Sequence, residues 1–181
     1  MSAKNSTEVG LNTQPLMDHL DALHDAINYR VVSLPGLAIG STSAAKVKIT
    51  NATQIIVNGV GATVSAAEVA FTATTHDITA DASAVQEAVY LLSADSAGTV
   101  TITKGTTASG AGKALIPATP AGETAIGYVR IAVEVGATDF DATTDLLSAS
   151  HLTDTYVDLG GNVEGLKRFD SAWSPGGVTA S

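Results

Sequence analysis

The chain has 181 residues, a formal net charge of −9, no cysteine, and only 15% charged and 4% aromatic residues. This length supports one substantial core or a core with an arm. The negative charge disfavours nucleic acid and anionic membrane surfaces as partners, and the lack of cysteine excludes disulfides and thiolate metal sites. The N-terminus lacks the apolar segment of a signal peptide, and no run approaches the roughly 18 apolar residues of a membrane span.

Small and β-branched residues dominate the rest of the composition, and they suit thin sheets and close interfaces. So few charges favour a chain whose surface is largely covered by a partner, because obligate interfaces resemble a core cut in half. The alternative is an Ala- and Thr-rich monomer. We therefore expect a homo-oligomer.

The N-terminal region predicts an arm followed by a helix. Residues 1–12 are polar and aperiodic, whereas residues 14–30 have a helical pattern with Thr13 as N-cap and Pro15 in the first turn. The apolar face consists of Leu16, Leu20, Leu23 and Ile27, and the opposing acidic stripe of Asp18, Asp21 and Asp25. The helix either lies on its own sheet or associates with copies of itself around a symmetry axis. It spans barely two heptads, fewer than a coiled coil needs.

From Leu37 onward, short alternating runs separated by turn residues predict strands. These strands are expected at residues 46–50, 54–57, 60–64, 68–72, 88–92, 99–103, 124–135 and 155–159. Asn58-Gly59 and residues 95–98 predict hairpin turns. Residues 76–84 form a polar connection, residues 104–113 a Gly-, Ser- and Thr-rich loop, and residues 145–147 a short helical turn.

The longest strand pattern, residues 124–135, follows a turn predicted at Pro120-Ala121-Gly122. One face carries Val129, Ile131, Val133 and Val135, and the other carries Tyr128, Arg130 and Glu134. Period two with β-branched residues predicts a strand with one dry and one wetter face. We expect it to lie centrally in the sheet, and residues 155–159 to form an edge strand.

Together these patterns predict a mainly β fold: an antiparallel sandwich or barrel with one N-terminal amphipathic helix and extended terminal arms. The expected divisions are an arm and helix (1–33), a β-domain (34–159) and a Gly-rich C-terminal arm (160–181). Phe169 and Trp173 lie in this last arm among small residues. Isolated aromatic residues in such a tail are typical anchors that dock in a pocket, on their own domain or on a neighbour.

The motifs that suggest chemistry are incomplete. Gly110-Ala-Gly-Lys113 resembles part of a phosphate-binding loop, but Thr107 and Ala114 replace the first Gly and the final Ser or Thr of that pattern. No helix is predicted after it to direct an N-terminus at a phosphate. We interpret it as a glycine-rich loop.

Metal and catalytic residues are also poorly matched to known patterns. His19 and His24 are five residues apart, whereas two ligands on one helical face are three or four apart. We interpret the acidic stripe of the predicted helix as a solvated face, and the alternative is a cation site at a threefold axis. Asp139, Asp141 and Asp145 leave a loop calcium site open, although they lack the Gly and distal Glu of an EF-hand. His76, Asp77 and His151 have no accompanying nucleophile elbow.

One longer segment carries a resemblance to known proteins. ALIPATPAGETAIGYVRIAV, which begins at Ala114, resembles a segment of tailed-bacteriophage virion proteins, namely capsid decoration (cement) proteins, head fibres and tail-associated β-modules. VYLLSADSAGTVTITKG before it and TYVDL after it resemble the same proteins. The likeness spans residues 34–159.

The resemblance implies a structural virion component, often trimeric, bound to the exterior of an icosahedral shell through the major capsid protein. It implies neither catalytic residues nor a cofactor. The expected partner-binding residues are Phe169, Trp173, Leu16, Leu20, Leu23 and Ile27. The alternatives are a head or tail fibre module that binds a host glycan and, from another class, a virion-associated hydrolase.

Overall fold

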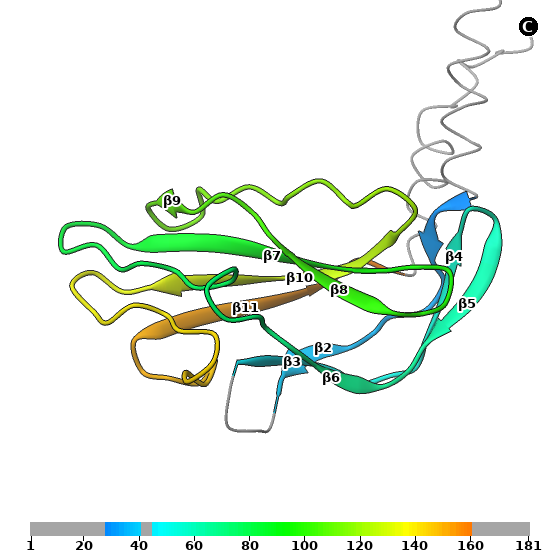
Figure 1. Cartoon of the computed structure of the whole chain (residues 1–181), viewed down its shortest axis with the longest axis horizontal. Helices are drawn as coiled ribbons and strands as arrows, with labels where there is room; N and C mark the ends of the chain where they lie inside the picture. Colours follow the sequence, from blue (N-terminus) through cyan, green and yellow to red (C-terminus); the bar gives the residue numbers. More distant parts are fainter. Residues whose placement is uncertain (1–27, 41–44, 161–181) are drawn as a thin grey trace, which may run out of the picture.

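The computed structural model describes residues 28–40 and 45–160, which fold into short antiparallel strands (Figure 1). The strands are β1 Arg30–Val31, β2 Leu37–Ile39, β3 Lys46–Ile49, β4 Thr53–Val57, β5 Val60–Val64, β6 Ala67–Ala70, β7 Gln86–Ala94, β8 Val100–Lys104, β9 Ala108–Ser109, β10 Thr124–Val133 and β11 Leu152–Asp158. No helix in this part of the chain is long and apolar enough to cross a membrane. The mainly β, antiparallel prediction is confirmed.

The strands form three sheets. The largest has the order β11-β10-β7-β8, with β9 paired to β7, and the others have the orders β1-β4-β5 and β2-β3-β6. β10 lies centrally and β11 at an edge, as predicted. The predicted helix lies outside the described residues except for its last three positions, and there the prediction is wrong at Arg30, which belongs to β1 and pairs with Ile56.

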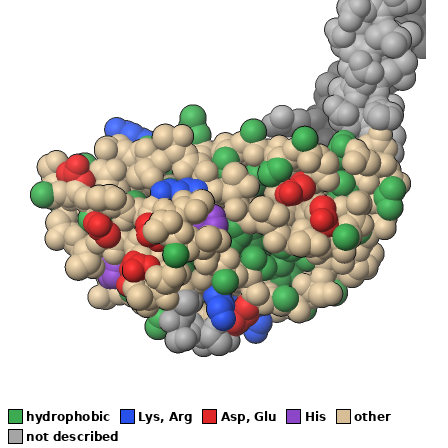
Figure 2. Space-filling view, viewed as in Figure 1, with side chains coloured by type: hydrophobic (Ala, Val, Ile, Leu, Met, Phe, Trp, Pro, Cys, Tyr) green, Lys and Arg blue, Asp and Glu red, His purple; other side chains and the backbone are tan. Residues whose placement is uncertain are grey.

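One hydrophobic core joins the inner faces of all three sheets. It includes Val47, Ile49, Ile55, Val57, Tyr90, Leu92, Val129, Ile131, Val133 and Phe140. Aromatic rings lie at its centre: Phe71 meets Tyr90 edge-on with ring centroids 4.9 Å apart. In Figure 2, hydrophobic side chains gather between β8 and β6, where half-buried Ile102 and Val69 border the core.

β7 is buried along its whole length because both of its faces are covered. Its inner face meets the core. Its outer face, which carries Glu87 and Ser93, is contacted by Gly112, Ala114 and Glu123. We call residues 105–123, which also pair along the edge of β7, the covering segment; it runs along β7 in Figure 1. Gly105 N donates to Val89 O at 2.7 Å, and β9 pairs with the start of β7. A strand covered on both sides has a continuous apolar pattern rather than an alternating one.

The turns explain the register of the hairpins. Asn58 and Gly59 both have positive φ, 51° and 74°, as a two-residue type I′ hairpin requires. Gly122 has φ 78°, and Glu123 N donates to Pro120 O, which confirms the predicted turn. Two expectations are wrong. Val135 lies beyond β10 and is exposed, and residues 145–147 are not helical, since Ala149 N donates to Leu146 O in an isolated turn.

Candidate partner-binding groove

Most of the described residues that suggested catalysis or metal binding are occupied by structural hydrogen bonds. The exception is His151, whose Nε2 is buried without a hydrogen-bond partner, 3.8 Å from Asp145 Oδ2. No group of three or more His, Asp or Glu side chains able to hold a metal ion occurs within residues 28–40 and 45–160.

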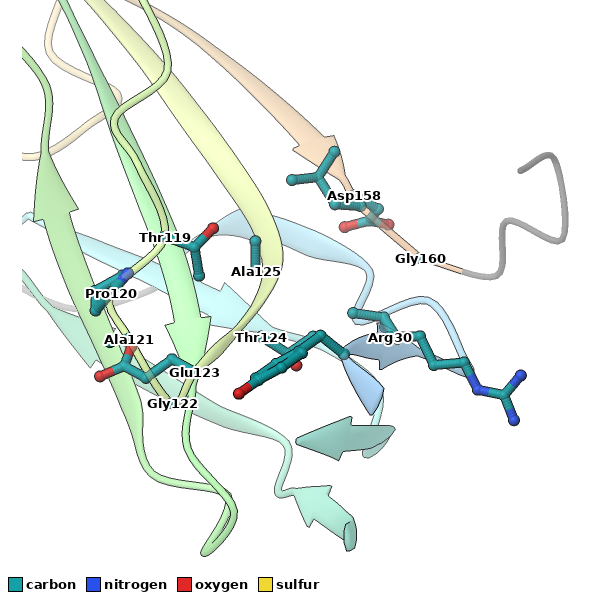
Figure 3. Close-up of a pocket in the computed structure, with 13 residues that line it drawn as sticks. Arg30, Thr119, Pro120, Ala121, Gly122, Glu123, Thr124, Ala125, Asp158 and Gly160 are labelled. Carbon is teal, nitrogen blue, oxygen red and sulfur yellow. The ribbon is translucent and has the colours of Figure 1, made fainter. Parts of the chain in front are cut away.

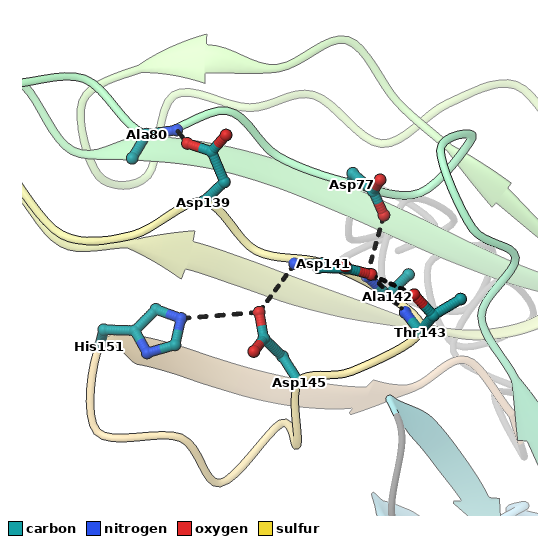
Figure 4. Close-up of polar contacts among 8 residues, drawn as sticks. All are labelled: Asp77, Ala80, Asp139, Asp141, Ala142, Thr143, Asp145 and His151. Carbon is teal, nitrogen blue, oxygen red and sulfur yellow. Dashed lines mark hydrogen bonds and ion pairs between the residues drawn. The ribbon is translucent and has the colours of Figure 1, made fainter.

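Each carboxylate of the acidic loop accepts a backbone amide (Figure 4). Asp139 accepts from Ala80 N at 2.8 Å, Asp141 from Thr143 N at 2.8 Å and Asp145 from Asp141 N at 2.7 Å. The Asp141 bond is typical of an Asx-turn, in which a short carboxylate satisfies the amide two residues on, whereas the Asp139 bond joins the loop to the distant residue Ala80. The hydroxyl and amide of Thr143 hold the pKa of Asp141 below its usual value. The three carboxylates therefore fix the loop and are not gathered around one point.

His76 is a core residue rather than a catalytic base. It is buried, its Nδ1 accepts from Thr72 N at 2.7 Å, and its Nε2 lies 3.3 Å from Ile102 O. The Thr72 bond requires an unprotonated Nδ1, so Nε2 carries the proton. Burial lowers the pKa of His76. The ring is thus held as a neutral imidazole that ties residues 72–76 to β8.

The glycine-rich loop that resembled a phosphate site already holds an anion, the side chain of Glu87. Gly112 N donates to Glu87 Oε2 at 2.8 Å and Ala114 N to Glu87 Oε1 at 3.0 Å. Arg130 Nη1 also donates to Glu87 Oε1. The amides that would hold a phosphate are therefore taken by a buried carboxylate, and the loop serves to fasten the covering segment.

Sequence reasoning missed this fastening. Glu87 stands just before the apolar run of β7, and Arg130 interrupts the apolar pattern of β10. An acid and a base at such positions are a signal that can be recognised, because buried charges are usually paired. The pattern does not reveal that the Glu87 and Arg130 side chains lie beneath residues 105–123.

A groove of about 770 Å³ lies at the end of the molecule where the described chain begins and ends. It is lined by Tyr29, Arg30 and Val31, by residues 119–125, and by Asp158, Leu159 and Gly160. Figure 3 shows the turn around Gly122 on one side and Asp158 on the other, with the Arg30 side chain directed away from the groove. We call this end of the molecule the pole.

The pole is rigid because it is the junction of the three sheets. Thr124 Oγ1 donates to Ile56 O at 2.8 Å, which joins β10 to β4. The Asp158 carboxylate accepts from Leu37 N at 2.8 Å and from Gly36 N at 3.2 Å, which joins β11 to β2. The Tyr29 hydroxyl donates to Asn58 Oδ1, which holds β1 to the β4–β5 hairpin. Hence the groove is a preformed surface suited to binding.

The expected anchor residues, Phe169, Trp173, Leu16, Leu20, Leu23 and Ile27, all lie outside the described residues. The groove adjoins both segments that carry them, since Tyr29 and Gly160 line it. No protein-family model matches this chain, and no curated protein or solved structure is significantly similar to it.

Proposed function

We propose that the protein is a non-enzymatic structural component of a tailed-bacteriophage virion that binds the exterior of the capsid shell as a decoration (cement) protein. The observation that carries the proposal is the pole, where Tyr29 and Gly160 line one groove, so the chain enters and leaves the β-domain at one place. The resemblance of residues 114–133 to virion proteins supplies the class of assembly.

The proposal extends to the arrangement of the subunit and its copies. The three sheets around one core would form a β-sandwich, and the low charge of the chain supports a homotrimer. Each copy would contact the major capsid protein through the pole and the arms. Several weak contacts made at once multiply avidity without any new chemistry.

The engagement of the His76 ring and the loop carboxylates in backbone bonds supports a binding role over hydrolysis. Tyr29 is 36% exposed in the groove, which gives a glycan-binding fibre module one aromatic surface for stacking. We place that function second, because the other tyrosines of the described residues are at least half-buried.

The test uses purified full-length chain and capsids prepared without it. Parent protein should co-sediment with capsids, and electron micrographs should show added density on the shell exterior. Trp173→Ala should weaken binding, since burying an aromatic of this size contributes about 2–3 kcal/mol. Leu146→Ala, which removes an exposed side chain from the acidic loop, is the matched control. Absence of parent protein from the shell, or binding to host glycans instead, would overturn the proposal.

A further inference from the structure

The outer surface of the covering segment presents two large apolar side chains. Leu115 is 80% exposed and Ile116 is 47% exposed. They border a pocket of about 340 Å³ that Lys104, Lys113 and Pro117 also line, and no carboxylate lines it. On a chain of net charge −9, this is an apolar surface with locally positive charge.

The backbone beneath these side chains is fixed. Ala114, next to Leu115, is buried and its amide bonds to Glu87 at 3.0 Å. Gly105 approaches so closely that an added Cβ would lie 2.7 Å from Leu115 O. The backbone that carries Leu115 and Ile116 is therefore fixed to the sheet, and their side chains are held in the solvent-exposed position. An exposed apolar pair on a fixed backbone is typical of a docking site.

We propose that this surface binds residues 14–27 of the same chain. The proposal goes beyond the proposed function and does not depend on it. The sequence of residues 14–27 predicts a helix with an apolar face of Leu16, Leu20, Leu23 and Ile27 and an acidic stripe of Asp18, Asp21 and Asp25. The apolar face matches Leu115 and Ile116, and the acidic stripe matches the charge of Lys113, whereas the Lys104 ammonium already donates to Asp77 O.

The position of the pole places the start of the described chain near the Leu115–Ile116 surface. Tyr29 lines the same groove as Thr119, so the described chain begins close to the end of the covering segment. From Thr119 back to Leu115 is four residues, which span at most about 14 Å. A helix over residues 14–27 is about 21 Å long at 1.5 Å per residue. Laid along the covering segment from the pole, such a helix reaches past Leu115.

The first test uses the absence of cysteine in the natural chain. The full-length double variant Leu16→Cys/Leu115→Cys is oxidised with oxidised glutathione, which accepts the two electrons released when the two thiols join. We expect a disulfide within one chain, formed at a rate independent of protein concentration. The matched control is Leu16→Cys/Val135→Cys, because Val135 is comparably accessible (52% exposed) but follows the end of β10 opposite the pole. Peptide mapping identifies the linked pair.

Each outcome decides the question. Linkage of Leu16→Cys to Leu115→Cys within one chain, with little in the control, supports the proposal. Disulfide-linked dimers would show that a second copy supplies the segment and would overturn it. Equal linkage in both pairs, or none in either, would also overturn it.

A charge reversal provides a second, independent readout. In the Leu16→Cys/Leu115→Cys background, Lys113→Glu should slow linkage several-fold, and adding Asp21→Lys should restore much of the rate. Lys113 is exposed, so its reversal leaves the fold intact. Unchanged linkage in Lys113→Glu would contradict the electrostatic part of the match.

Discussion

Arg130 on β10 donates a hydrogen bond to Glu87 on β7, and the Glu87 carboxylate simultaneously holds two amides of the covering segment. Glu87 is only 2% exposed, so its charge is stabilised by these three donors rather than by water. The pair thus joins a sheet to the segment above it. It is the polar contact on which burial of the outer face of β7 depends.

Removing the carboxylate should destabilise the protein strongly. Glu87→Ala leaves the buried Ala114 amide, the part-buried Gly112 amide and a guanidinium without their acceptor, and we expect the free energy of unfolding to fall by about 3 kcal/mol. Glu134→Ala, which removes an exposed acid just after β10, should change it by less than about 0.5 kcal/mol. Urea unfolding measures both. Equal stability of the two variants would contradict the role given to Glu87.

The same residue should make stability depend on pH. Burial alone would raise the pKa of Glu87, but the Gly112 and Ala114 amides and the Arg130 guanidinium together hold the pKa below its ordinary 4.5. A carboxyl whose pKa is lower in the folded state stabilises the fold above its unfolded pKa, and this stabilisation is lost as the pH falls through the folded pKa. The difference in unfolding free energy between parent and Glu87→Gln should therefore be constant near pH 7 and shrink below about pH 4.5. If the difference in unfolding free energy between the two proteins grew as the pH fell, the role of the ionised Glu87 carboxylate would be contradicted.

His76 gives a second pH dependence, in a different range. Its folded pKa is lower than the ordinary 6.5, so the unfolded chain takes up a proton first as the pH falls. Stability should decline as the pH drops below about 6.5. His76→Asn, which does not titrate, should lack this decline while being less stable at pH 7.5, because Asn replaces a packed ring. NMR titration of the His76 ring should give an apparent pKa below 6.5.

Three glycine substitutions should separate steric clash from backbone strain. Gly98 has φ 80°, and a Cβ added there would lie 2.3 Å from Thr63 O. Gly122 has φ 78°, but a Cβ added there would meet no atom within 4 Å. At Gly61 an added Cβ would also meet no atom, and φ is not positive. Replacement by Ala should lower the free energy of unfolding by more than about 2 kcal/mol at Gly98, by about 1 kcal/mol at Gly122, and by less than about 0.5 kcal/mol at Gly61. Thermal unfolding of the three variants measures the order. A tolerated Gly98→Ala would mean that the β7–β8 turn does not rest on β5.

The sequence predicts much of the sheet because its longer strands have strong local signals. In β10 the buried and the more exposed positions alternate, and Asn58-Gly59 can adopt the positive φ angles of a tight hairpin. β1 and β9 have two residues each, too few for any period, and they exist only because distant residues pair with them. The groove is likewise formed by residues about 130 positions apart, such as Tyr29 and Asp158, which no local pattern connects. The expected anchors of the two arms stay predictions.

The meeting of both chain ends at the pole also determines how the domain would respond to mechanical force. Tension applied through residues before Asn28 enters at β1, which is held to β4 by two residue pairs, Arg30 with Ile56 and Val31 with Ile55. Tension through residues after Gly160 enters at β11, whose seven pairs with β10 would open one after another from Asp158. Because the two points of attachment are neighbours, a pull between the arms would peel these edges at the pole and leave the β7–β10 pairing unloaded. Under such tension the domain would therefore open first at its rim, while its core stays paired.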